Sequence, residues 1–246
     1  MHVQLFATCL GDLLLPEAVA DAEALLRAAG HEIVFPDGQT CCGQPAFNAG
    51  HRKAAARVAK QFTRAFSRDL PVVCPSGSCA TMVARYLPEL LHVEPYEVYE
   101  LSSFLSKASN TVSQAASGRS PGAARPSNTV SLAGKRVAYH DSCHLLRELG
   151  VSAEPRELLA EAGADVVELD RPDLCCGFGG TFSVRQPEVS VAMADDKLAD
   201  AQRSGAEALV TADPGCLVHL TARAARAGGP PVVHLATALA RGLERG

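Results

Sequence analysis

One pattern of cysteines occurs twice along the chain, and this duplication constrains the fold more than any other feature. Cys9 precedes Cys41 by 32 positions, and Cys143 precedes Cys175 by the same 32 positions. Each interval ends in Cys-Cys-Gly, and a further cysteine follows that pair after 37 positions in the first copy and 40 in the second. Such an internal repeat predicts that the 246 residues form two related halves.

The segments between the cysteines alternate between strand patterns and helix patterns. Short apolar runs predict strands over residues 3–7, 31–35, 71–74 and 97–101, and again over 136–140, 165–169, 208–211 and 231–235. Helical periodicity predicts helices over residues 16–29, 50–67, 102–107, 155–162, 188–204 and 236–241. This alternation predicts an α/β fold in which each half has a small, mostly parallel sheet with flanking helices, in Rossmann- or flavodoxin-like layers.

The repeated cysteines all follow predicted strands. In parallel sheets ligands bind at the carboxyl ends of the strands, so we expect three distant segments of each half to meet at one site. The candidate ligands are Cys9, Cys41, Cys42, Cys74 and Cys79 in the first half, and Cys143, Cys175, Cys176 and Cys216 in the second. The copies align four against four, and Cys74 is matched by Thr211.

The segment between the two copies differs in composition from the rest of the chain. Residues 106–134 are rich in Ser, Ala, Gly and Pro and have few large apolar side chains. Such a segment buries too little surface to offset the entropy lost on ordering. We therefore predict a first domain over residues 1–105, a flexible linker over 106–134 and a second domain over 135–246.

Nine cysteines in this chain need a chemical explanation. The N-terminus lacks the basic start and long apolar core of a signal peptide, and no apolar run reaches the roughly 20 residues that span a bilayer. We therefore predict a cytoplasmic protein without a membrane span, in a compartment that disfavours structural disulfides. A net charge of −4 and 5% aromatic residues argue against a nucleic-acid partner.

Adjacent cysteines suit a polynuclear metal centre better than a disulfide. Their Cα atoms lie about 3.8 Å apart, below the roughly 4.4–6.8 Å of relaxed disulfides. Four thiolates per half suffice for one [4Fe–4S] or [2Fe–2S] cluster. Zinc usually takes cysteines in closely spaced pairs, and only Cys74 and Cys79 have such spacing. A zinc-binding structural or assembly scaffold is the alternative from another class.

Polar residues beside the cysteines have less specific patterns. His140 and His144 are candidates for a hydrogen bond to sulfur or for a proton relay, although a histidine bonded to backbone is the commoner case. His51 is interpreted as an exposed helix residue. Asp141 and Asp213 are interpreted as residues that orient loops, and no residue is assigned as catalytic.

The two blocks, C-x31-CCG…PSGSC and C-x31-CCGFGG…DPGC, resemble the cysteine-rich CCG-domain family of iron–sulfur oxidoreductase subunits. That family includes the CCG-containing subunit of heterodisulfide reductase and the iron–sulfur subunit of glycolate oxidase. The short chain, with Cys-His-Leu at 143–145 and Arg-Glu-Leu-Gly at 147–150, is similar to the lactate utilization protein A branch. The resemblance covers the whole chain except the linker.

The resemblance implies an iron–sulfur electron-transfer subunit of a cytoplasmic complex that oxidises L-lactate to pyruvate. Its implied partners are the other subunits of a lactate utilization complex. Because no residue pattern indicates a dehydrogenation site, a small 2-hydroxy acid is expected only at a shared interface. The resemblance also implies one iron–sulfur cluster per half, of the [4Fe–4S] type. The implied ligands are Cys9, Cys41, Cys42, Cys79, Cys143, Cys175, Cys176 and Cys216.

The chain departs from the heterodisulfide reductase pattern at the end of each block. In that pattern each block ends in C-x-x-C and supplies five ligands to a non-cubane cluster. Here the second block ends in a single cysteine, and four residues separate Cys74 from Cys79. The departure argues against a five-thiolate cluster in the second half. A disulfide reductase subunit is therefore a further alternative and not the expected function.

Overall fold

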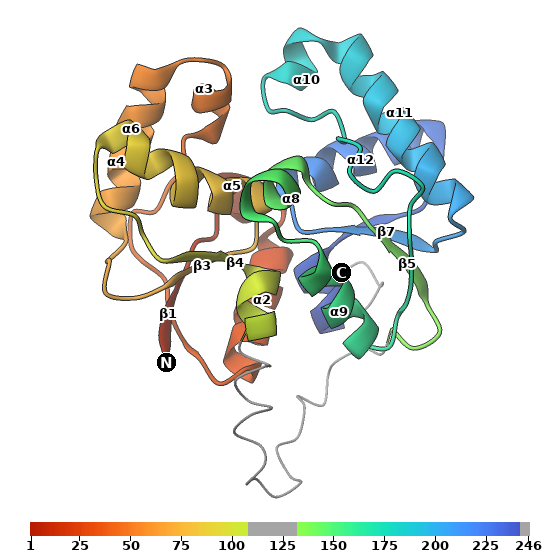
Figure 1. Cartoon of the computed structure of the whole chain (residues 1–246), viewed down its shortest axis with the longest axis horizontal. Coiled ribbons are helices and arrows are strands. Elements are labelled where there is room, and N and C mark those ends of the chain that lie inside the picture. Colours follow the sequence, from red (N-terminus) through yellow and green to blue (C-terminus); the bar gives the residue numbers. More distant parts are fainter. Residues whose placement is uncertain (108–131, 242–246) are drawn as a thin grey trace, which may run out of the picture.

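The computed structural model describes residues 1–107 and 132–241. Within these residues the chain forms two four-stranded sheets, one from each half of the sequence (Figure 1). Residues 108–131, which make up most of the predicted linker, lie outside the described residues. The linker and the domain boundaries beside it therefore stay predictions.

Each half contains a fully parallel sheet of the same topology. The strands are β1 (His2–Leu5), β2 (Glu32–Val34), β3 (Val72–Cys74) and β4 (Val98–Glu100), then β5 (Arg136–Tyr139), β6 (Asp165–Val167), β7 (Ala208–Thr211) and β8 (Val232–His234). Their spatial orders are β2-β1-β3-β4 and β6-β5-β7-β8. All six neighbouring pairs are parallel. The predicted α/β fold of two repeated halves is confirmed.

The helices of the first half are α1 (Cys9–Leu14), α2 (Pro16–Ala28), α3 (Gln44–Asn48), α4 (Arg52–Ala65), α5 (Gly77–Thr81), the π-helical turn η1 (Met82–Tyr86) and α6 (Leu87–Leu91). Residues 101–107 are also helical. The second half contains α8 (Cys143–Leu149), α9 (Ala153–Glu161), α10 (Phe182–Arg185), α11 (Pro187–Arg203), α12 (Pro214–Ala227) and α13 (Leu235–Arg241). No helix of the described ranges is long and apolar enough to cross a membrane.

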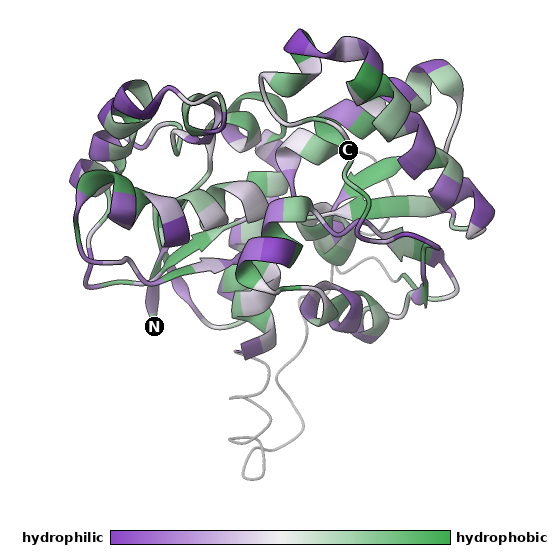
Figure 2. Cartoon of the chain, turned by 45° about the horizontal axis from the view of Figure 1, so that its top comes forward, coloured by the Kyte–Doolittle hydropathy of each residue, from purple (hydrophilic) through white to green (hydrophobic). Residues whose placement is uncertain are grey.

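Helices cover both faces of each sheet. Successive side chains of a strand point to opposite faces, so Val3 packs with α2, whereas Phe6, directly after β1, packs with α4. In β5, Val137 packs with α9 and α13, and Ala138 packs with α11 and α12. Burial on both faces explains why β3 and β7 are almost continuous apolar runs, whereas the edge strands β2 and β6 are partly exposed. In Figure 2 most strand segments are hydrophobic, and the helices carry hydrophobic and hydrophilic residues in turn.

The strand order creates a topological switch point in each sheet. From β1 the chain moves to β2 on one side and then to β3 on the other side of β1. In the second half it moves in the same way from β5 to β6 and then to β7. In sheets of this order ligands bind beyond the carboxyl ends of the two strands at the switch point. Cys9 and Cys79 follow β1 and β3, and Cys143 and Cys216 follow β5 and β7. The fold therefore brings these cysteines to the ligand-binding edge of each sheet.

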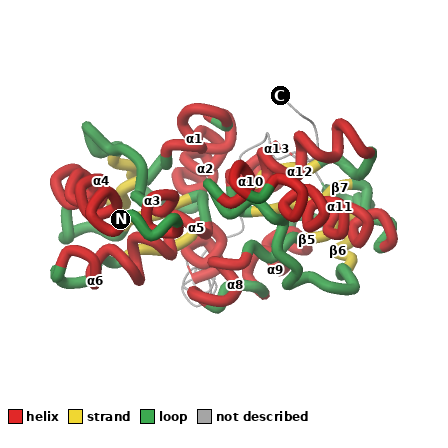
Figure 3. Tube along the Cα trace, turned by 90° about the horizontal axis from the view of Figure 1, so that it is seen from above, coloured by secondary structure: helices red, strands yellow, loops and turns green. Residues whose placement is uncertain are grey.

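The two halves contact each other mainly through two pairs of helices, α2 with α13 and α5 with α8, and less extensively through α1 with α12 (Figures 1 and 3). Asp21 of α2 accepts hydrogen bonds from Thr237 Oγ1 at 2.9 Å and from Arg241 Nε at 2.6 Å. At the other contact, a Cβ atom on Gly77 would lie 2.7 Å from Leu145 Cβ. The glycine permits α5 to approach α8 closely. These contacts hold the two cysteine-bearing edges against each other.

Glu100, the last residue of β4, is a buried carboxyl group with one unpartnered oxygen. Its exposed fraction is 1%. Its Oε2 accepts hydrogen bonds from the Ser102 backbone N–H and hydroxyl, while Oε1 has no partner among the described residues. Burial raises the pKa of Glu100 from 4.5 to about 7. The folded protein therefore keeps a proton that the unfolded chain loses between about pH 4.5 and 7.

We expect the stability of the protein to fall as the pH rises through this window. Below pH 4.5 both states are protonated, and above about pH 7 the folded state must bury a charge. At about 1.4 kcal/mol per pKa unit, the loss amounts to about 3 kcal/mol. Glu100→Gln should abolish this loss in urea unfolding measured from pH 4 to pH 8. The exposed Glu157→Gln is the control, and a slope unchanged by Glu100→Gln would contradict the prediction.

Candidate functional site

One cavity of about 180 Å³ lies between the two halves, and both sets of repeated cysteines line it. The lining cysteines are Cys9, Cys41, Cys42, Cys79, Cys143, Cys175, Cys176 and Cys216. They are the eight residues that the sequence analysis singles out as ligands. Cys74 is fully buried but does not line the cavity, and its thiol donates to the carbonyl oxygen of Ser76 at 3.5 Å.

In the first half, three separate segments carry the cysteines to the cavity. Cys9 begins α1, the Cys41-Cys42 pair lies in the loop after β2, and Cys79 lies in the first turn of α5. The Sγ atoms of Cys42 and Cys79 are 3.3 Å apart. Gly43 has a φ of 92°, and its backbone N–H donates to Cys41 Sγ at 3.4 Å. The three segments therefore converge, as the strand pattern predicts.

The second half repeats this arrangement. Cys143 begins α8, and the Sγ atoms of Cys176 and Cys216 are 3.1 Å apart. The backbone N–H of Gly177 donates to Cys175 Sγ at 3.4 Å, and that of Phe178 donates to Cys176 Sγ at 3.5 Å. Each half thus presents four sulfur atoms, which we call the first and the second quartet. In both quartets a backbone N–H group donates to a cysteine sulfur.

Hydrogen bonds between the thiols separate their pKa values. The thiols of Cys42 and Cys9 donate to Cys41 and lower its pKa, and those of Cys143 and Cys176 do the same to Cys175. The pKa of Cys9 rises because it donates to Cys41 and is partly buried. The thiol of Cys42 also donates to Cys79 and lowers its pKa to about 5, so the first quartet holds two sulfurs poised to lose a proton and the second holds one, Cys175. The thiolate is the form of cysteine that binds a metal.

Asp213 connects the two quartets through the backbone. Its Oδ1 accepts hydrogen bonds from the N–H groups of Gly215 at 3.0 Å and Cys216 at 3.4 Å, so it caps the N-terminus of α12. Its Oδ2 accepts from the N–H of Ser78 in α5, at 2.8 Å, across the boundary between the halves. One carboxylate thus orients the helix turns that carry Cys79 and Cys216. The bonds agree with the predicted loop-orienting role and extend it to the first half.

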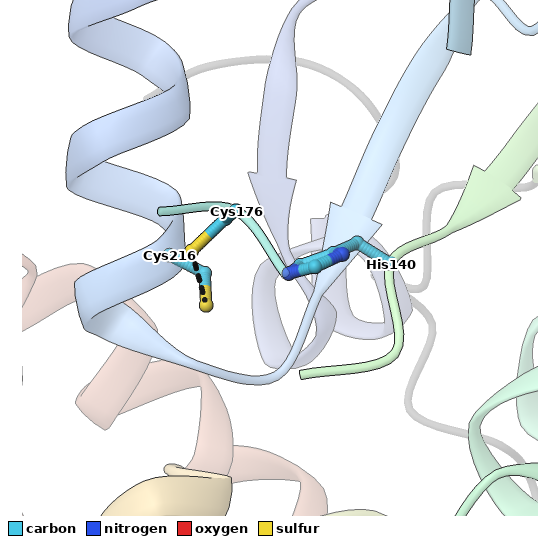
Figure 4. Close-up of side chains that lie close together, drawn as sticks. All are labelled: His140, Cys176 and Cys216. Carbon is cyan, nitrogen blue, oxygen red and sulfur yellow. Dashed lines mark hydrogen bonds between the residues drawn. The ribbon is translucent and has the colours of Figure 1, made fainter. Parts of the chain in front are cut away.

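His140 lies beside the second quartet without a hydrogen-bond partner. Its side chain is fully buried, and neither ring nitrogen has a partner among the described residues. A ring nitrogen and the Sγ atoms of Cys176 and Cys216 all lie within 4.8 Å of one another (Figure 4). Burial and the nearby Lys197 lower the pKa of His140 to about 3, so the ring is neutral. The commoner role, a histidine bonded to backbone, is not what the structure shows.

The other polar candidates differ in their surroundings. His144 lines the cavity, with its Nδ1 3.6 Å from Cys143 Sγ. His51 is exposed at the start of α4, as predicted. Asp141 forms a bidentate ion pair with Arg156, at 2.8 and 2.9 Å, and this pair holds the loop after β5 to α9.

Lys197 of α11 is a buried cation that the sequence analysis missed. It is fully buried, and its Nζ donates to the carbonyl oxygens of Arg171 at 2.8 Å and Pro172 at 3.1 Å. A signal for it exists in the sequence. Lys197 occupies the buried stripe of α11 together with Ala194 and Ala201, at the helical spacing of three and four residues. A lysine on an apolar stripe indicates a specific partner.

Comparisons with known proteins agree with the duplication. The CCG cysteine-rich domain family matches residues 3–84 and 137–221. Lactate utilization protein A 2 of Bacillus cereus is 38% identical over 257 residues, covering 100% of both chains. Lactate utilization protein A of Halalkalibacterium halodurans is also 38% identical, covering 97% of this chain and 96% of the relative.

Among solved structures, allantoin racemase from Pseudomonas fluorescens aligns with a TM-score of 0.31 at 14% identity. That alignment covers 97% of this chain and 87% of the racemase. A TM-score of this size carries no argument about fold or function.

Proposed function

Because this chain belongs to the CCG cysteine-rich family, in its lactate utilization protein A branch, we propose that it is an iron–sulfur electron-transfer subunit of an oxidoreductase complex. In this proposal the complex oxidises L-lactate to pyruvate in the cytoplasm. The observation that carries the proposal is the pair of four-sulfur quartets that line one cavity.

The donor set of the cavity fits iron–sulfur clusters. In each quartet the four side chains are thiols, which are the ligands that such clusters take. Cys9, Cys41, Cys42 and Cys79 would hold one cluster, and Cys143, Cys175, Cys176 and Cys216 would hold the other. When bound, each cluster supplies the uptake and release of one electron at a time.

The chain contributes more than ligands in this proposal. The N–H groups of Gly43, Gly177 and Phe178 point at ligand sulfurs, where hydrogen bonds tune the reduction potential. Cys42 and Cys176 are almost fully buried, which limits the access of water to the sulfurs. The protein would thus hold, orient and shield the redox centres.

Two one-electron sites match the proposed oxidation of lactate, the compound that the relatives' names contain. Oxidation of lactate to pyruvate releases two electrons and two protons. The two quartets would hold two one-electron centres, which is the capacity that this oxidation needs, and the protons would leave at the site where the hydroxy acid binds. We place that site on a partner subunit or at an interface shared with it. The names of the Bacillus and Halalkalibacterium relatives support lactate as the substrate of the complex.

A zinc-binding assembly scaffold is the second candidate. One ring nitrogen of His140 and the sulfurs of Cys176 and Cys216 lie within 4.8 Å of one another, which suits a mononuclear zinc ion. Zinc would give the chain a structural role and no electron transfer. A CCG-type disulfide reductase subunit is the less favoured alternative, because Cys74 lies outside the cavity and a fifth ligand is missing there.

Metal analysis of anaerobically purified protein tests the proposal. We expect about eight iron atoms and about eight acid-labile sulfides per chain, as two [4Fe–4S] clusters require. Adding L-lactate should bleach the cluster absorption when the partner subunits are present, and should leave it unchanged for the isolated chain. Iron near zero with stoichiometric zinc would falsify the cluster assignment and favour the scaffold. Full iron without bleaching by L-lactate in the complete complex would exclude this substrate.

A further inference from the structure

The two halves differ at the residue that directly follows the first strand of each sheet. Phe6 follows β1 and His140 follows β5, and each lies three positions before the first cysteine of its half. Phe6 packs edge-on against Phe62 and Phe66, with centroid distances of 5.3 Å, and brings no polar atom to its quartet. His140 instead brings a buried, unpartnered ring next to the sulfurs of the second quartet (Figure 4).

A second difference lies in the helix that follows each Cys-Cys-Gly turn. Gln61 of α4 donates from Nε2 to the carbonyl oxygen of Gly38 at 2.9 Å, three positions before Cys41. Lys197 of α11 donates to the carbonyl oxygen of Pro172, three positions before Cys175. The two side chains occupy corresponding places, but one is a neutral amide and the other is a buried ammonium group.

The positive charge of Lys197 acts on the second quartet. Burial lowers the pKa of Lys197 only to about 8, so the group is mostly charged at neutral pH. The nearby Asp200 carboxylate is already paired with Arg203 at 3.0 Å and accepts bonds from the N–H groups of Asp170 and Arg171. The carboxylates of Asp141 and Asp173 also act on Lys197, and Asp141 is paired with Arg156 at 2.8 Å. The ammonium group itself donates to backbone carbonyl oxygens and forms no ion pair with a carboxylate among the described residues.

The carboxylate of Asp213 does not cancel the difference between the two halves. Its Oδ1 accepts from the N–H of Cys216 in the second quartet, and its Oδ2 accepts from the N–H of Ser78, beside Cys79 of the first quartet. Asp213 thus lies beside both quartets, whereas Lys197 lies on α11, which packs with Cys176 of the second quartet. The charge environment of the two quartets is unequal.

We propose that the second quartet holds the more easily reduced of the two redox centres, because His140 and Lys197 stabilise negative charge there. The inference rests on the proposed iron–sulfur function. Reduction adds one electron to a buried site, and a buried cation and an N–H donor near sulfur both favour the reduced form. In the first half, the corresponding residues Phe6 and Gln61 supply neither a buried cation nor a ring N–H donor next to the sulfurs. Electrons shared between the two centres therefore settle on the second.

A redox titration of the full-length, iron-loaded chain, followed by EPR, tests this inference. The wild type should show two midpoint potentials. Cys176→Ser should remove the higher one, which assigns it to the second quartet. His140→Phe and Lys197→Gln, which install the first-half residues, should each lower that midpoint. The expected size is about tenfold in the reduction equilibrium, or about 59 mV for one electron. The lower midpoint should not move.

Conservative variants separate this effect from misfolding. His140→Leu removes the donor with a smaller side chain, and Lys197→Arg keeps the charge and should keep the higher midpoint. Gln61→Lys is the mirror change in the first half and should raise the lower midpoint. Iron content should equal that of the wild type in all of these variants.

The outcomes of the titration are distinguishable. A wild-type chain that binds no iron overturns the proposed function and this inference together. Full iron with two equal midpoints, or with a higher midpoint that survives Cys176→Ser, overturns only the inference. Variants of His140 and Lys197 that leave both midpoints unchanged overturn it as well.

Discussion

Replacing one cysteine of either quartet by serine should remove about half of the iron from the anaerobically purified chain. Cys42→Ser and Cys176→Ser are the sharpest variants, because their side chains are only 1% and 2% exposed and their sulfurs lie 3.3 Å from Cys79 Sγ and 3.1 Å from Cys216 Sγ. A serine hydroxyl does not replace a thiolate as a ligand of an iron–sulfur cluster. The other quartet comes from other loops and should keep its cluster.

The matched control for this prediction is Cys74→Ser. Cys74 is equally buried, but it lies outside the cavity and bonds to the carbonyl oxygen of Ser76. Its replacement should leave the iron content nearly unchanged. A loss as large as that of Cys42→Ser would instead assign five ligands to the first half.

A third outcome bears on the shared cavity. Because both quartets line one cavity, the alternative to two separate clusters is a single metal centre that both quartets bind. In that case either single variant would remove nearly all of the iron, and the two effects would not add. Iron and sulfide analysis of the double variant, with Cys42 and Cys176 both replaced, separates the arrangements. Two independent centres require that the single losses add to a complete loss.

The convergence within each half was predictable because it follows from strand direction. Once β1, β2 and β3 are assigned and taken as parallel, their carboxyl ends must meet at one edge, and Cys9, Cys42 and Cys79 must follow. The repeat strengthens the assignment, because two unrelated apolar runs rarely share one spacing. The predicted strands accordingly match β1 to β8 within one or two residues.

The placement of the two halves against each other was not predictable from the repeat. It depends on single contacts, such as Asp21 with Arg241 and Gly77 beneath Leu145, that join segments far apart in the sequence. The sequence therefore predicts one site per half but not one cavity lined by both. Asp213 bonding to Ser78 has the same origin.

Helix α12 was not predicted, and the reason lies at its first residues. The Pro214-Gly215 pair is ordinarily a turn signal. Here Pro214 is the first helical residue, where its missing N–H costs nothing, and Asp213 is the N-cap. An Asp-Pro pair ahead of an apolar stripe that includes Leu217 and Leu220 is thus better interpreted as a helix start. The first turn of this helix carries Cys216 to the cavity.

Gly177→Ala should destabilise the second half strongly and remove its share of the iron. Gly177 has a φ of +88°, and a Cβ atom there would lie 2.5 Å from the backbone oxygen of Ser190. The turn cannot shift away, because Ser190 Oγ donates to the Gly177 carbonyl oxygen at 2.7 Å. The left-handed backbone costs about 1 kcal/mol and the overlap about 1–3 kcal/mol more. We therefore expect a loss of about 3 kcal/mol in the free energy of unfolding.

Gly150→Ala separates the two contributions to this loss. Gly150 has a φ of +70°, but a Cβ atom there meets no other heavy atom within 4 Å, so only the backbone term of about 1 kcal/mol should appear. Its iron content should equal that of the wild type. Urea unfolding of the metal-free chains measures the stabilities, and iron analysis follows the site. Equal losses in the two variants would show that the turn at Gly177 has room for a side chain, and that the fixed position of Cys175 and Cys176 has another cause.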